Sequence, residues 1–106
     1  MPKYMIAASY TAEGLKGLLR DGGTGRRAAI EKALVPVGGK IEAFYFSFGD
    51  TDAILITDLP DNASAAAVAL ATSGLGFVRT RTTVLLTPEE VDQAAQKSVA
   101  YRPPGV

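Results

Sequence analysis

The order of apolar and polar positions divides the chain into short elements, and a strand and a helix come first. An apolar run over residues 4–10 predicts a β-strand. Thr11 then offers the N-cap of a helix. Three glycines among residues 22–25 predict a break or kink in that helix. Helical spacing resumes over residues 26–35, and Pro36 ends it.

The middle of the chain predicts a hairpin followed by a second helix. Two strands are expected over residues 40–48 and 52–58, with residues 49–51 as a short loop between them. The segment 62–73 is rich in alanine, the best helix former, and Gly74 follows it as a stop signal.

The last third predicts one more strand, a short helix and an irregular end. Residues 77–86 have the composition of a strand. Thr87 is followed by proline and two glutamates, a typical helix start, and this helix is expected to run to about residue 97. Residues 99–106 are rich in proline and glycine. We therefore divide the chain into one domain, residues 1–98, and an irregular C-terminal arm, residues 99–106.

The predicted order is β-α-β-β-α-β with an additional C-terminal helix. Two crossovers joined by a hairpin give an α+β, ferredoxin-like fold, in which a four-stranded antiparallel sheet carries its helices on one face. Such a sheet should alternate apolar and polar residues. Both faces of these strands are instead largely apolar. The first strand has Tyr4, Ile6, Ala8 and Tyr10 on one side and Met5 and Ala7 on the other. The second has Ile41, Ala43 and Tyr45 on one side and Phe44, Phe46 and Phe48 on the other.

The second apolar face predicts self-association. Two helices cover only one face of the sheet, and soluble monomers rarely expose large apolar patches. The simplest cover is the same face of a second copy, so we expect a sheet-to-sheet homodimer or a higher oligomer. The alternative is a monomer with a somewhat apolar open face.

The composition excludes several classes of chemistry. The chain has 106 residues, 11 Lys plus Arg, 11 Asp plus Glu, and neither His nor Cys. Disulfides, thiolate nucleophiles, and Ser-His-Asp or Cys-His catalysis are therefore excluded, and we expect no metal site and no cofactor. The zero net charge argues against a nucleic-acid partner. No apolar run is long enough to span a membrane, and no signal-peptide pattern is present, so a cytoplasmic location is expected.

Five short motifs follow one another along residues 4–92. They are Thr11-Ala12-Glu13-Gly14, Val37-Gly38-Gly39-Lys40, Phe44-Tyr45-Phe46-Ser47-Phe48-Gly49-Asp50-Thr51-Asp52, Leu59-Pro60-Asp61 and Gly76-Phe77-Val78-Arg79-Thr80. In this order they resemble the GYD family of small bacterial proteins. The resemblance implies a ferredoxin-like fold assembled as a dimeric α/β barrel, in agreement with the strand order and the two apolar faces. It implies no particular reaction.

The chain departs from the family pattern in two places. Thr51 stands where an aromatic residue usually precedes the Asp that matches Asp52, and the glycine-rich stretch at residues 22–25 looks looser than usual. Because of the first departure, the sequence does not predict a pocket bordered by that aromatic residue.

Arg79 and Arg81 are the first candidates for a ligand-binding site. They lie two positions apart on a predicted strand and therefore point to the same face. Paired guanidinium groups suit a ligand with a carboxylate or phosphate. The alternative is salt bridges to Asp50, Asp52 or Asp58, within the chain or across a subunit interface. Arg79 is the better candidate because it falls within a matched motif.

Tyr10 and Tyr45 are the second pair of candidate ligand-binding residues. With Phe46 they would line a cavity between sheet and helices, or they would simply be core. Related dimeric α/β barrels, including cofactor-free oxygenases, hold small hydrophobic ligands in such cavities. A tyrosine hydroxyl can donate a hydrogen bond to a developing oxyanion.

The hairpin contributes Gly49, Asp50 and Asp52, to which we assign a structural role. Two nearby carboxylates can bind a hard cation or share a proton. Asp in a glycine-containing turn more often bonds the backbone nearby. Gly49 is expected to supply a backbone conformation that other residues resist.

These patterns favour a homo-oligomeric binding or interaction module with a pocket for a small apolar or anionic metabolite. Its partners would be a second copy and a small molecule, with no nucleic acid and no membrane. The alternative is a cofactor-independent, oxygenase- or isomerase-like enzyme that uses Tyr10 or Tyr45 together with Arg79. A closed pocket containing Arg79 and a tyrosine hydroxyl would favour the enzyme, whereas the lack of a His base weighs against it.

Overall fold

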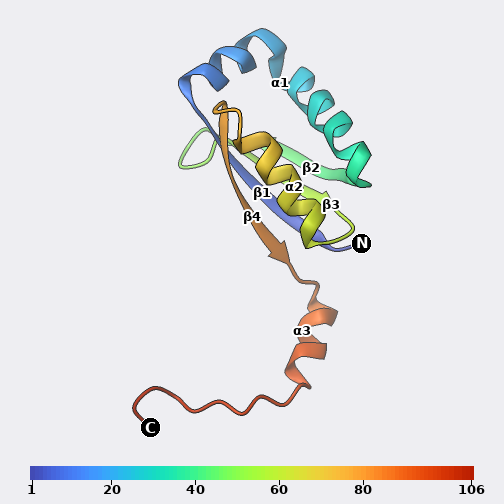
Figure 1. Cartoon of the computed structure of the whole chain (residues 1–106), viewed down its shortest axis with the longest axis vertical. Helices are drawn as coiled ribbons and strands as arrows, with labels where there is room; N and C mark the ends of the chain where they lie inside the picture. The colour runs from blue at the N-terminus through green and yellow to red at the C-terminus, as the bar shows by residue number, and fades with distance from the viewer.

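The computed structural model describes residues 1–106 and has the predicted order of elements (Figure 1). The elements are β1 (Lys3–Tyr10), α1 (Ala12–Leu34), the short 3₁₀-helix η1 (Val35–Val37), β2 (Lys40–Phe46), β3 (Ala53–Asp58), α2 (Asn62–Ser73), β4 (Val78–Leu85) and α3 (Pro88–Ala95). The predicted strand and helix boundaries agree with these to within about two residues. No helix has the length and apolar character needed to cross a membrane.

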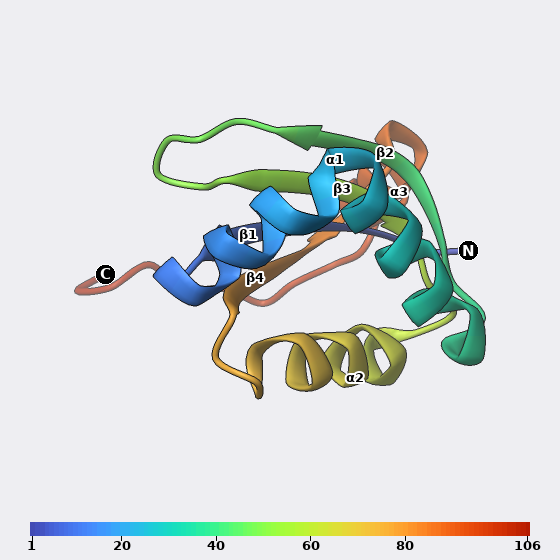
Figure 2. The ribbon, with the colours of Figure 1, turned by 90° about the horizontal axis from the view of Figure 1, so that it is seen from above.

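The four strands form one antiparallel sheet in the order β2-β3-β1-β4. Seen along the long axis, α1 lies over β2, β3 and β1, and α2 lies on the β4 side (Figure 2). Both helices pack against the same face of the sheet, which we call the inner face. The α+β, ferredoxin-like fold with helices on one face is therefore confirmed.

The core lies between the inner face and the two helices. It consists of two clusters of buried residues, Tyr4, Leu34, Leu59 and Ala65 in one and Ile6, Ala8, Ala53 and Leu55 in the other. The strand residues among them are alternate positions, because neighbouring side chains of a strand point to opposite faces.

A β-bulge in β2 changes the face of one predicted residue. The sequence pattern places Ile41 with Ala43 and Tyr45, and the structure shows that this is wrong. The pairing register shifts between Ile41 and Ala43, so Ile41 lies opposite Thr57 and packs against the core. A bulge inserts one extra residue into a strand, and the alternation of faces restarts after it.

Helix α1 is bent at Gly22, where φ is 75° and ψ is 165°. This region of backbone conformation is essentially restricted to glycine. The predicted break is therefore present, as a kink within one continuous segment. The kink turns the second half of α1 back over the inner face, where Leu34 is completely buried.

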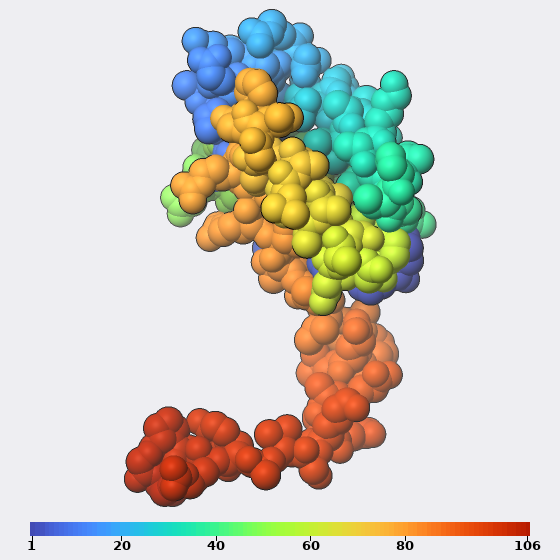
Figure 3. All heavy atoms as spheres, in the orientation of Figure 1, coloured from blue at the N-terminus to red at the C-terminus, as the bar shows by residue number.

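The opposite face of the sheet, which we call the open face, is covered by no helix of the chain. The pairing register places the following residues on the open face: Met5, Ala7, Ala43, Tyr45, Ile54, Ile56, Arg79, Arg81, Thr83 and Leu85. After β4 the chain continues as Leu86–Val106, which we call the C-terminal extension. Every residue of this extension is exposed, and it projects away from the domain (Figures 1 and 3).

Candidate functional site: a cavity beneath the kinked helix

A cavity of about 530 Å³ lies between α1, α2 and the inner face. This volume falls within the range of about 300–1,000 Å³ that is typical of small-molecule sites. The wall is mainly apolar and includes Ile6, Phe44, Leu55, Val68 and Phe77. The space-filling view shows the surface hollowed between α1 and α2 (Figure 3).

Small residues explain why this space is not filled by the chain itself. The helices and strands present glycine and alanine to the cavity at Ala8, Gly14, Gly17, Ala29, Ala33, Ala53 and Ala71. A Cβ atom added at Gly17 would have no neighbour within 4 Å. The hollow is thus a direct consequence of which side chains the sequence places between the layers.

Gly14 is required for a different reason. A Cβ atom at this position would clash with the backbone carbonyl of Phe77 and with the Tyr10 ring. The Thr11 N–H donates a hydrogen bond of 3.0 Å to the same Phe77 carbonyl. Close packing at Gly14 therefore fixes the start of α1 against the segment that leads into β4.

The charged groups of the cavity gather at the kink of α1. Arg20 and Asp21 precede Gly22, Arg26 follows it, and all three charged side chains line the cavity. The Arg26 Nη1 atom lies 3.6 Å from the Asp21 Oδ2 atom, and the Arg26 side chain is 28% exposed. Arg20 makes no ion pair. Two guanidinium groups and one carboxylate leave a net positive charge at this end of the cavity.

Only one of the two tyrosines predicted to bind a ligand lines this cavity. Tyr10 lines it, at the end of β1. Tyr45 lies opposite Ile54 in the register, on the open face, and 71% of its surface is exposed. The two tyrosines are therefore on opposite sides of the sheet.

The two predicted arginines are also on the open face. Arg79 pairs with Ser9 and Arg81 pairs with Ala7 in the antiparallel register, which puts both guanidinium groups on the side away from the helices. Neither forms a salt bridge within the chain. Tyr10 and Arg79 therefore lie on opposite faces of the sheet, whereas Tyr45 and Arg79 share the open face but lie on its two edge strands, β2 and β4. The enzyme hypothesis and the ligand-binding role of both arginines stay predictions.

A sequence model of the GYD domain matches residues 4–95 of the chain. The chain belongs to the GYD domain family. The match extends from β1 to the end of α3, so it includes the cavity, the open face and the helix that follows β4. Neither a search of curated proteins nor a search of solved structures finds a match.

The β2–β3 loop of the GYD domain is tied to β1 by hydrogen bonds. The Asp52 Oδ2 atom accepts a hydrogen bond of 2.8 Å from the Tyr10 N–H. The Ser9 hydroxyl donates one of 3.2 Å to the Asp50 carbonyl. Through these contacts the loop holds the end of β1, next to the cavity-lining Tyr10.

The prediction that Gly49 supplies the unusual backbone conformation of this loop is wrong. Gly49 does not have a positive φ, whereas Phe48 does, at 52°. The Phe48 ring stacks on Phe46 with ring centroids 5.7 Å apart. Aromatic stacking therefore accompanies the left-handed conformation, which non-glycine residues rarely adopt.

Sequence reasoning missed Arg20, Asp21 and Arg26 as site residues of the GYD domain. Their only sequence signal is that they flank the glycine-rich break at residues 22–25. Which side chains face the sheet depends on the direction that α1 takes after Gly22, and the residue pattern does not specify that direction.

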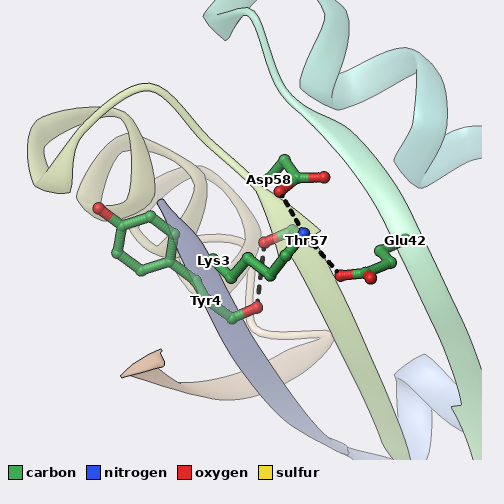
Figure 4. Close-up of polar contacts among 5 residues, drawn as sticks. All are labelled: Lys3, Tyr4, Glu42, Thr57 and Asp58. Carbon is green, nitrogen blue, oxygen red and sulfur yellow. Dashed lines mark hydrogen bonds and ion pairs between the residues drawn. The ribbon is translucent and has the colours of Figure 1, made fainter. Parts of the chain in front are cut away.

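An ion-pair cluster lies at one end of the sheet, where Lys3 reaches across β3 to β2 (Figure 4). The Lys3 Nζ atom is 2.8 Å from Asp58 Oδ1 and 2.9 Å from Glu42 Oε2. The hydrogen bond from Lys3 lowers the pKa of the Asp58 carboxyl below its ordinary value. The hydrogen bonds to Asp58 and Glu42 raise the pKa of Lys3. The cluster joins three neighbouring strands and so helps to fix their register.

The adjacent residue, Tyr4, points to the inner face instead (Figure 4). Its hydroxyl donates a hydrogen bond of 2.7 Å to the Asn62 Oδ1 atom, at the start of α2. Its carbonyl accepts one of 3.3 Å from the buried Thr57 hydroxyl. Asp61 caps the same helix, and hydrogen bonds from Ser64 lower the pKa of the Asp61 carboxyl. Tyr4 thus anchors the helix that forms one wall of the cavity.

Proposed function

We propose that this GYD domain protein is a homo-oligomeric binding module that holds a small, mainly apolar molecule carrying one anionic group. The observation that supports this most strongly is the apolar cavity of about 530 Å³ with the guanidinium of Arg26 at one end. An apolar wall with a few polar groups at one place is the usual construction of a site that both buries and orients a ligand.

The apolar wall supplies the affinity in this proposal. Burying hydrocarbon contributes about 0.8 kcal/mol per CH₂ group. The alanine and glycine residues of the wall leave space for such a group without displacing any larger side chain. A ligand that fills the cavity also covers Tyr10 and Phe77, which are otherwise partly exposed.

Arg26 supplies the preference for an anion. Its contact with Asp21 is 3.6 Å long, so it is not a short charge-assisted hydrogen bond. A ligand carboxylate can form shorter, paired hydrogen bonds with a guanidinium group. The partial burial of Arg26 strengthens this attraction relative to a fully exposed pair.

The experiment compares two probes that differ mainly in charge, decanoate and decanol. Each is titrated against the fluorescence of bound anilinonaphthalene sulfonate, a dye that responds to accessible apolar surface. We expect decanoate to bind about tenfold more tightly than decanol, a difference of about 1.4 kcal/mol. The substitution Arg26→Gln should abolish that difference by weakening decanoate alone. Arg27→Gln is the matched control, because Arg27 lies beside Arg26 in sequence but pairs with Glu31 outside the cavity.

A second variant tests the location of the site independently of charge. Gly17→Leu places a large side chain in open cavity space and adds a good helix former. It should weaken both probes, whereas Ala28→Leu, an exposed position of α1 outside the cavity, should weaken neither. Unchanged binding to Gly17→Leu would place the ligand elsewhere and refute the proposal.

The homo-oligomer is supported by the open face. Met5, Ile54, Ile56 and Leu85 share this face and are only partly buried by the chain itself. A two-fold contact between two such faces removes them from water. Size-exclusion chromatography with light scattering should give a dimer or larger species, and a monomer at micromolar concentration would contradict this part of the proposal.

A further inference from the structure

The whole chain exposes far more surface than a compact protein of its mass. Its accessible surface is 7323 Å², whereas a compact monomer of 11.1 kDa exposes about 5,700 Å². Its radius of gyration is 16.8 Å, whereas about 13 Å is expected for a compact domain of this length. The excess of about 1,600 Å² falls within the area that each chain loses in an obligate homodimer, about 1,000–2,500 Å².

Much of this extra surface belongs to the C-terminal extension, Leu86–Val106. Its large apolar residues lie in water, with Leu86 61% exposed, Val91 52%, Val99 80% and Tyr101 71%. The extension nevertheless contains a regular helix. Helix α3 begins with a complete capping box, in which Thr87 and Glu90 each bond the other's backbone N–H. A capped helix with no packing partner within its own chain indicates a partner outside it.

Helix α3 has an apolar side and an acidic side. Val91, Ala94 and Ala95 are three and four positions apart and therefore lie on one side of the helix. The helix also carries three acidic residues and no basic one. Glu89 and Asp92 take part in no salt bridge and no side-chain hydrogen bond within the chain.

The open face has the complementary character. It is apolar around Met5, Ile54 and Ile56, and its β4 edge carries Arg79 and Arg81. Both arginines are exposed and lack an acidic partner within the chain. These unpaired arginines match in charge the unpaired Glu89 and Asp92 on the acidic side of α3.

We infer that the C-terminal extension of each copy docks on the other copy of a dimer, with Glu89 and Asp92 of α3 against the partner's Arg79 and Arg81. The inference rests on the dimer proposed above and adds how that dimer is held together. Within one chain, α3 follows the end of β4 and extends away from the sheet (Figure 1). An exchange between copies lets it reach the arginines without a sharp reversal after Leu85.

The test exchanges charges between the two proposed contact surfaces in the full-length chain. The sheet variant is Arg79→Glu with Arg81→Glu, and the helix variant is Glu89→Arg with Asp92→Arg. In the homodimer of either variant, like charges meet at both α3–sheet contacts. We therefore expect the dimer dissociation constant to rise about 10- to 100-fold. A control with the same change of charge as the sheet variant, Lys16→Glu with Lys32→Glu on the outer side of α1, should change it by less than about threefold.

Mixing the two weakened variants is the decisive measurement. In their heterodimer, both contacts join opposite charges, so the heterodimer should regain wild-type affinity and dominate an equimolar mixture in native mass spectrometry. The regained affinity also shows that both variants are folded.

Three results would overturn the inference. A wild-type dimer that neither variant weakens more than the control would show that α3 does not meet these arginines, while the dimer itself stands. A chain with all four substitutions could regain the affinity of the dimer while a mixture of the two variants does not. That result would show that α3 folds back on its own sheet. A monomeric wild type would refute both this inference and the proposed dimer.

Discussion

Replacing Gly22 with alanine tests the kink on which the cavity depends. At φ 75° and ψ 165°, Gly22 has a backbone conformation that alanine avoids because of its Cβ atom. Nothing within 4 Å would obstruct that Cβ atom, so the cost comes from the backbone alone. The chain can respond in only two ways, by keeping the strained conformation or by straightening α1.

The expected destabilisation is similar for both responses. Keeping the conformation costs about 1–3 kcal/mol. Straightening α1 withdraws its second half from the core, and Leu34, which is completely buried, then loses about 1.5–3 kcal/mol of burial free energy. We therefore expect Gly22→Ala to lower the free energy of unfolding by about 1–3 kcal/mol. For a domain of this size, a loss of 2 kcal/mol lowers Tm by roughly 10 °C.

Gly17→Ala is the matched control on the same helix. Gly17 has helical backbone angles, and its Cβ position is open. Alanine should therefore stabilise the protein by about 0.5–1 kcal/mol through helix propensity. Thermal and urea unfolding are followed by circular dichroism at one protomer concentration, because association makes Tm depend on concentration. A Gly22→Ala protein as stable as the wild type would show that α1 is not kinked at this position, and the cavity geometry would have to be revised.

Three further changes test the contacts around the site. Gly14→Ala should destabilise the protein by about 1–3 kcal/mol in urea unfolding, because its methyl group clashes with the Phe77 carbonyl, and a gain like that of Gly17→Ala would contradict the close packing there. Tyr4→Phe should cost about 0.5–1.5 kcal/mol through loss of the bond to Asn62, while the exposed Tyr45→Phe should cost nothing measurable in the same assay. Asp58→Asn should lower Tm at pH 7. Because the folded-state pKa of Asp58 is lowered, this difference should be present above about pH 4 and should shrink as the pH falls through that lowered pKa. Asp50→Asn, which breaks no ion pair, is the control and should leave Tm at pH 7 unchanged. A Tm difference for Asp58→Asn that persists in strong acid would contradict the ion-pair explanation.

The ends of the helices could be predicted from the sequence because short-range chemistry determines them. Thr11, Asp61 and Thr87 each accept a hydrogen bond from a backbone N–H of the first helical turn, as their side chains predict. The glycine-rich break in α1 was visible for the same reason. These features depend on residues three or four positions apart, and tertiary contacts did not override them.

Features that depend on tertiary geometry could not be predicted from the sequence. The bulge beside Ile41 adds one residue to β2, and an apolar run without clear alternation gives no sign of it. Phe48 has a positive φ although Gly49 stands next to it. Arg26 faces the cavity because of the angle of the kink at Gly22, which is a property of the folded helix and of no single motif.

The two unfilled surfaces of this GYD domain have a common origin in its sequence. Apolar residues make up 47% of the chain, yet only 12 of its 106 residues are buried. On the inner face, alanine and glycine are too small to fill the space under α1. On the open face, the chain has apolar side chains but no further helix to cover them. Burial is thus incomplete for two different reasons, insufficient side-chain volume on one side and a missing layer on the other. A small molecule can fill the space under α1, and a second copy can cover the open face. The two proposals therefore rest on separate observations.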